Sequence, residues 1–220
     1  MNLLNLTNAF IRETGATDVV QTITEASDDV LQAVHWINHA WILIQGSKLW
    51  PFRWAEGSVD VAIGKVSYTT AELSRALGDT FMRDSWYHAN GDIQEIPYTE
   101  IRDKRRLDTK SGATPDASRI THVSLRYGPL GPQLDTYPAV DETKTLVYDY
   151  WTQPTEMVVD TDIPVGLPSA VQMMLVHHAL VSYGALEGGQ EGANQYSHHG
   201  GLYTVLRNQW ETSLPLTSPR

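Results

Sequence analysis

Histidine is the residue type in this chain that offers the most chemistry. Eight histidines are present, and four of them form two adjacent pairs, His177-His178 and His198-His199. If the pairs lie on antiparallel helices, one ring from each could approach a common metal ion. Neighbouring residues on a helix point about 100° apart, however, so an adjacent pair makes a poor chelate. We therefore expect helix–helix or subunit contacts from these histidines, and no metal site.

Acidic residues that could work as a catalytic pair fall in predicted loops, namely Asp141, Glu142, Asp160 and Asp162. Two such carboxylates could serve a glycosidase, but loop acids in a chain of formal net charge −10 are usually solvated. Phosphate-binding GxGxxG and GxxxxGK[ST] loops, the GxSxG elbow and the HExxH zinc motif are all missing. Without cysteine, the chain also has no disulfides, thiol catalysis or Cys-ligated metals. We predict a protein that is not an enzyme and has no cofactor.

One basic cluster stands out, the RDKRR run at residues 102–106. It could meet DNA or an acidic partner, or it could be a solvated helix face balanced by Glu100, Asp103 and Asp108. We favour the solvated face, because a net charge of −10 disfavours general nucleic-acid binding.

The elements that must position these residues are helices at both ends of the chain. Apolar spacing predicts helices over residues 3–14, 28–49, 168–187 and 191–212, with Pro168 at the first turn of the third. The 28–49 segment is apolar on more than one side, so we expect it to be buried on more than one side, partly by another subunit.

Between the helices, alternating residues predict strands. We expect a hairpin over residues 58–70 around a Gly-Lys turn, a second hairpin at Asn90-Gly91, a short helix or turn over 96–110, and strands within 119–138 and 143–154. The predicted fold class is α+β, a bundle of about four helices with an antiparallel β-rich module inserted between the second and third helices. The predicted domains are a helical domain (1–50 and 155–212), the inserted module (51–154) and an extended C-terminal arm (213–220).

Aromatic residues are the second clue to assembly. Trp50, Phe52 and Trp54 surround a proline where the second helix enters the module. The set predicted to form the core or a subunit interface, where aromatic anchors are common, is Trp36, Trp41, Trp50, Phe52, Trp54 and Trp210. No stretch is apolar enough to span a bilayer and the N-terminal residues do not form a signal peptide, so we expect a soluble protein made in a cytoplasm.

Five short motifs, in order along the chain, resemble the long head-to-tail adaptor (head-completion) proteins of tailed bacteriophages. They are Ile37-Asn38-His39-Ala40 (I-N-x-A), Trp50-Pro51-Phe52 (W-x-F), Gly112-Ala113-Thr114-Pro115 (G-x-P), the 146–150 strand L-x-Y-x-Y with Pro154, and the 162–168 segment D-x-P-x-x-L-P. The tyrosine that commonly lies near G-x-P is absent at its expected place.

The resemblance implies a structural virion protein at the neck, in a ring (commonly a dodecamer) that joins the portal to the tail and continues the DNA channel. DNA would pass without specific binding. The resemblance assigns portal contact to residues 211–220, including Leu214, Pro215, Leu216 and Arg220. The β module would face either the tail-side partner or the outer rim. The alternatives are another neck protein, such as a stopper or tail-completion protein, and a cell-wall hydrolase that uses the loop acids or the histidines.

Overall fold

The computed structural model describes two compact parts of the chain. Residues Met1–Phe52 and Pro154–Arg220 form a helical unit, and Arg53–Gln153 form a β unit. The residues whose structure is described are 1–15, 19–23, 27–69, 72–73, 80–81, 87–88, 91–112, 114–128, 131–187 and 189–214.

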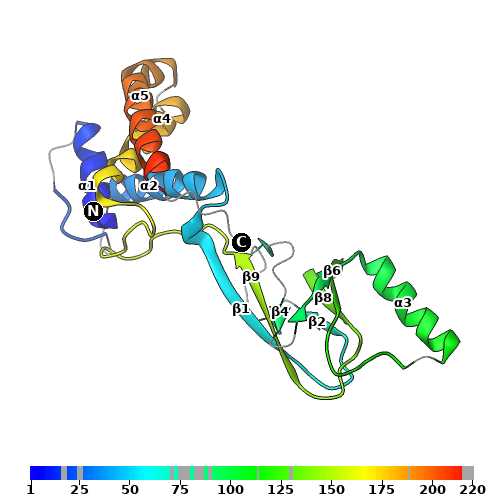
Figure 1. Ribbon diagram of the computed structural model, residues 1–220. Coiled ribbons are helices and arrows are strands. Elements are labelled where there is room, and N and C mark those ends of the chain that lie inside the picture. The colour runs from blue at the N-terminus through cyan, green and yellow to red at the C-terminus, as the bar shows by residue number, and fades with distance from the viewer. Residues whose placement is uncertain are drawn as a thin grey trace. The chain divides into compact units, whose positions relative to one another are not determined.

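Four α-helices make up the helical unit. They are α1 (Leu3–Glu13), α2 (Asp28–Gly46), α4 (Met173–Leu186) and α5 (Gly189–Ser213), with a short 3-10 helix at Ser169–Val171. Helix α4 packs along α5, and α2 packs against both α1 and α4 (Figure 1). The prediction over 28–49 ran past the helix, which ends at Gly46, and the 168–187 segment opens with the 3-10 turn before α4 begins.

A single apolar cluster fills the helical unit, and both faces of α2 contribute to it. Val30, Ile37, Trp41 and Ile44 lie on the predicted stripe, and Trp36 widens it. The expected burial on more than one side is therefore present within one copy of the chain.

Two sheets form the β unit. In the first, β1 (Trp54–Val61) pairs antiparallel with β9 (Lys144–Trp151) along its whole length, and β9 also pairs with β3 (Thr80–Phe81) and β4 (Tyr87–His88). The second sheet has the order β2 (Ser67–Thr69), β8 (Gly131–Tyr137), β7 (His122–Gly128) and β6 (Gln94–Glu95). Strand β6 runs parallel to β7, so the module is not purely antiparallel.

The hairpin predicted over residues 58–70 is wrong. Strand β1 pairs with β9 and β2 pairs with β8, so the two arms of the expected hairpin belong to different sheets. The turn itself is present at Gly64, whose φ of +70° suits glycine. The Gly64 amide donates to the carbonyl of Val140 at 3.0 Å, so this turn is bonded to a segment distant in sequence and not to a hairpin partner.

The second predicted hairpin is confirmed. Strand β4 pairs antiparallel with β5 (Gly91–Asp92), with His88 opposite Gly91; Asn90 lies outside the described residues. The helix predicted over 96–110 is α3 (Tyr98–Ser111), which lies against β7 and β8 and ends at Gly112 in the left-handed conformation. With helices and sheets segregated along the chain, the predicted α+β class is confirmed.

Candidate interaction surfaces

The histidine pairs join α4 to α5. The Nδ1 atoms of His177 and His199 lie 2.9 Å apart, and the rings of His198 and His199 are 3.9 Å apart. Burial lowers the pKa of His177 and of His199, which favours neutral rings that share one hydrogen bond. Among the described residues, no group of three or more metal-ligating side chains gathers here or elsewhere.

Two of the acids considered for catalysis hold a loop in place. Asp160 accepts hydrogen bonds from the Thr22 hydroxyl at 2.8 Å and from the Ile23 amide at 2.9 Å. The carboxylate of Asp162 accepts the amides of Val158 and Val159 at 2.6 and 2.9 Å, which lowers its pKa.

The other two acids lie elsewhere. Asp141 and Glu142 follow β8 in the β unit, both exposed, and Glu142 pairs with Lys144. Asp141 and Glu142 therefore belong to the β unit, whereas Asp160 and Asp162 belong to the helical unit.

The hydrogen bonds of Asp160 and Asp162 hold residues 158–165, named here the 158–165 loop. This loop presents aliphatic side chains to solvent. Its exposed members are Val158, Val159, Ile163 and Val165, each more than half exposed. The start of α1 fastens the loop: the Leu3 amide donates to the Asp162 carbonyl at 2.7 Å. A fixed loop with several exposed aliphatic side chains is characteristic of a contact surface.

The sequence predicted a loop between Pro154 and Pro168, but it did not predict that the aliphatic side chains of residues 158–165 would form an exposed surface. Four aliphatic residues interrupted by Asp160, Asp162 and Pro164 have no helical or strand period, so they resembled a plain connection. The sequence feature that could have indicated this surface was the number of branched apolar residues between Pro154 and Pro168.

Two buried amide side chains on α2 hold the chain that leads into this loop. Asn38 donates to the carbonyl of Met157 and accepts its amide, both at 2.9 Å. Gln45 makes the same pair of bonds with Thr155, at 2.8 and 3.2 Å. The two side chains thus take the place of a neighbouring strand for the backbone of Thr155, which is exposed, and of Met157, which is buried.

Most of the predicted aromatic anchors belong to the core of the helical unit. Trp36, Trp41, Trp50 and Trp210 are buried there, and Phe52 is partly buried against them. In the β unit, Trp54 is 48% exposed, which leaves it available to a partner.

Stacked tryptophans close the C-terminal end of α5. The rings of Trp50 and Trp210 stack at 4.1 Å, and Lys48 lies over the Trp50 ring while its ammonium group is 3.3 Å from Glu211. Leu214 packs against the same core. Of the predicted portal-binding residues, Pro215, Leu216 and Arg220 lie outside the described residues.

The predicted basic run lies on α3, where its side chains divide between two faces. Towards the strands, Ile101 is fully buried, and Arg105 donates to the carbonyls of Val66 and Thr136 at 3.2 and 2.8 Å. Away from the strands, the helix exposes Arg102, Arg106, Leu107 and Lys110. Helix α3 lies at the edge of the β unit, so this outer face meets solvent (Figure 1).

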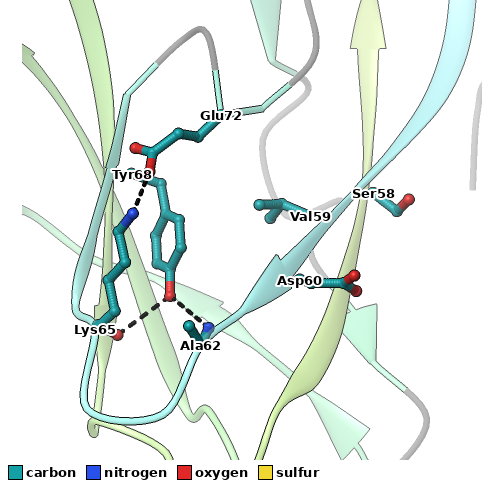
Figure 2. Close-up of a pocket in the computed structure, with 7 residues that line it drawn as sticks. All are labelled: Ser58, Val59, Asp60, Ala62, Lys65, Tyr68 and Glu72. Atoms are coloured by element: carbon teal, nitrogen blue, oxygen red, sulfur yellow. Dashed lines mark hydrogen bonds and ion pairs between the residues drawn. The ribbon is translucent and has the colours of Figure 1, made fainter.

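A polar cavity of about 350 Å³ lies beside the turn that leads from β1 to β2. Figure 2 shows the Tyr68 hydroxyl at its centre, accepting the Ala62 amide at 3.0 Å and donating to the Lys65 carbonyl at 3.3 Å. Lys65 pairs with Glu72 and helps to lower the pKa of that carboxyl to about 2. These polar groups satisfy one another, so they stabilise the turn.

Charge is divided unequally between the two units. The helical unit carries 4 Lys and Arg against 11 Asp and Glu, whereas the β unit carries 12 against 15. The net charge of −10 therefore comes mainly from the helical unit. No helix in the described part of the chain is long and apolar enough to cross a membrane.

Comparison with known proteins agrees with an assembly role. No curated protein matches the chain significantly. The family described as SU10 adaptor protein matches residues 1–212, which covers both units and all five motifs noted in the sequence. The chain therefore belongs to the SU10 adaptor protein family, a family of phage head–tail adaptors.

Proposed function

We propose that this protein forms a homo-oligomeric ring, a dodecamer, at the neck of the virion, joins the portal to a tail-side neck or tail protein, and continues the DNA channel. Membership of the adaptor family carries the proposal, because such a protein is a virion component that contacts other phage structural proteins. The ring, the neck position and the portal contact go further, and three features support them.

The first feature is the 158–165 loop. Its exposed aliphatic side chains are held by bonds from α1 and from Asp162, so the loop is ready to bind without first being ordered. A ring needs two different surfaces on every copy, one for each neighbour. The loop supplies one such surface on the helical unit.

The second feature is charge. With 4 cations against 11 anions, the helical unit repels a phosphate backbone. If this unit lines the channel, DNA slides past the wall and does not adhere to it.

The third feature is the fixed end of α5. Trp210 is fully buried and Leu214 packs on the core, so the end of α5, after which the C-terminal arm begins, is fixed in the helical unit. We propose that Leu214, Pro215, Leu216 and Arg220 contact the portal.

Truncation after Leu214 tests the portal contact. The variant keeps Trp210 and the packed end of α5, so its folding and its assembly with other copies should match the full chain. Portal binding, measured by co-sedimentation with purified portal, should fall by more than about tenfold. Unchanged portal binding would show that the arm is not the contact.

Microscopy of the complete virion tests the ring itself. The full chain should form a closed ring between portal and tail in an averaged image of the neck. A single copy, or a ring at the far end of the tail, would favour the stopper or tail-completion alternative. The hydrolase alternative has no support in the described structure, since Asp160 and Asp162 are engaged in loop hydrogen bonds.

A further inference from the structure

Helix α3 has a cationic outer face that its own unit does not use. Arg102, Arg106 and Lys110 follow one another at intervals of four residues, so they share one side of the helix. Leu107, 63% exposed, lies beside them. In the described structure no ion pair reaches Arg106 or Lys110, and Arg102 approaches only Asp103, at 3.9 Å.

The packing of α3 on the sheet is thin for a helix of 14 residues. Ile101 is its one buried residue, and the other inward contacts are polar. A short polar helix gains little from propensity alone and is stabilised mainly by what packs on it. The outer face, with a leucine among cations, has the composition of an interface in which an apolar anchor is surrounded by charge.

The turn between α4 and α5 has the opposite composition. Leu186 is 70% exposed, and Glu187 and Glu191 are exposed on either side of the turn. Neither glutamate takes part in an ion pair within the described residues.

Glu187 is also badly placed for the stability of α4. It is the C-cap of the helix, where the helix dipole is negative, and the last turn of α4 contains no basic residue. A carboxylate at this position is unfavourable, whereas a cation there is favourable. The last turn of α4 supplies no cation, so a cation from another molecule would stabilise this end of α4; Glu191, in the first turn of α5, lies instead at a helix end that favours an acid.

We propose that the outer face of α3 docks on the α4–α5 turn of a neighbouring copy of this chain. Leu107 then packs against Leu186, and Arg106 and Lys110 pair with Glu187 and Glu191. The inference rests on the proposed ring, because it assigns the contact to two neighbouring copies.

Charge complementarity identifies the occupant as a second copy. Helical units with 4 cations against 11 anions repel one another when they lie side by side in a ring. The outer face of α3 supplies positive charge from each copy to the next and offsets this repulsion. DNA fits the same face less well, since Asp103 and Glu100 interrupt it and a phosphate backbone makes no use of Leu107.

Charge exchange tests the contact. The variant Arg106→Glu/Lys110→Glu should lower the association constant of the subunits by more than about tenfold, and so should Glu187→Lys/Glu191→Lys. A chain that carries all four substitutions should associate within about threefold of wild type, since the pairs are restored with reversed sign. Native mass spectrometry at physiological salt measures the oligomer, with portal present and absent, and circular dichroism checks that each variant is folded.

Arg12→Glu/Arg119→Glu is the matched control, because it changes the net charge equally at two exposed arginines that belong to neither α3 nor the α4–α5 turn. It should leave association unchanged. The inference is overturned if the fourfold variant does not recover, if the control loses as much as the α3 variant, or if the α3 variant assembles normally and loses only binding to double-stranded DNA. Failure of the wild-type chain to assemble even with portal would overturn the ring itself.

Discussion

Replacement of Trp210 by alanine should release the C-terminal end of α5. The Trp210 side chain is fully buried, and its ring stacks on Trp50 at 4.1 Å and lies 6.0 Å from Phe52. Truncating a buried tryptophan removes its transfer free energy and leaves a cavity, at a typical cost of 3–5 kcal/mol. Since a whole domain is stable by about 5–15 kcal/mol, Trp210→Ala should leave the helical unit close to unfolding at 37 °C.

Phenylalanine at the same position separates packing from hydrogen bonding. The indole nitrogen of Trp210 is buried without a hydrogen-bond partner, so Trp210→Phe loses area and no bond. Trp50 differs, because its indole donates to the Ile44 carbonyl at 2.6 Å. Trp50→Phe should therefore destabilise the helical unit by about 1 kcal/mol more than Trp210→Phe.

Urea unfolding followed by far-ultraviolet circular dichroism measures these free energies of unfolding. Trp54→Ala is the control, since the Trp54 side chain is 48% exposed and its loss should cost less than about 1.5 kcal/mol. If Trp210→Ala cost no more than Trp54→Ala, the stacked pair would not be what fastens α5. If the two phenylalanine variants were equal, the Trp50 hydrogen bond would contribute nothing.

Three further predictions concern the helical unit and the turns. Burial lowers the pKa of His177 and of His199, so the unfolded chain binds more protons than the folded chain. The contribution of these rings to the free energy of unfolding is therefore complete above about pH 6.5 and falls as the pH drops below it. The variant His177→Gln/His199→Gln should flatten a plot of melting temperature against pH between about pH 5 and pH 8. Asn38→Leu leaves a buried amide and carbonyl unpaired and should cost about 3 kcal/mol in urea unfolding, unlike a substitution on the exposed side of α2. Gly166→Ala should prevent folding or cost more than about 2 kcal/mol in urea unfolding, because the new Cβ would lie 2.3 Å from the Phe52 ring and the φ of Gly166 is +78°. Gly64 has a similar φ of +70° but open space around it, so Gly64→Ala should cost about 1 kcal/mol.

The helices could be predicted from the sequence because their signals are local. Val30, Ile37 and Ile44 repeat at helical spacing, and α2 forms where they are. Strand pairing could not be predicted in the same way. Residues 58–70 contain a correct turn and correct alternation, but each arm pairs with a strand more than sixty residues away in the chain. Alternation decides which face of a strand is buried and leaves its neighbour open.

The aromatic residues show a second limit. A buried tryptophan and an interface tryptophan have the same sequence signal, and the burial of Trp36, Trp41, Trp50 and Trp210 within a single copy explains them without a partner. Exposed residues in a loop gave no signal of any period, although the 158–165 loop exposes Val158, Val159, Ile163 and Val165.

Motifs that are far apart in the sequence act on one segment of the structure. Asn38, from the I-N-x-A motif, pairs with the backbone of Met157, and Phe52, from W-x-F, fills the space that Gly166 leaves open in D-x-P-x-x-L-P. These three motifs therefore fix both ends of the chain that carries the 158–165 loop. Asn38, Phe52 and Gly166 need not touch a partner to be required for the proposed assembly, because each one helps to set the position of the loop side chains that we propose do so. A substitution at Asn38 or Gly166 should consequently weaken assembly through the loop as well as stability, whereas a polar substitution at Val158 should weaken assembly alone.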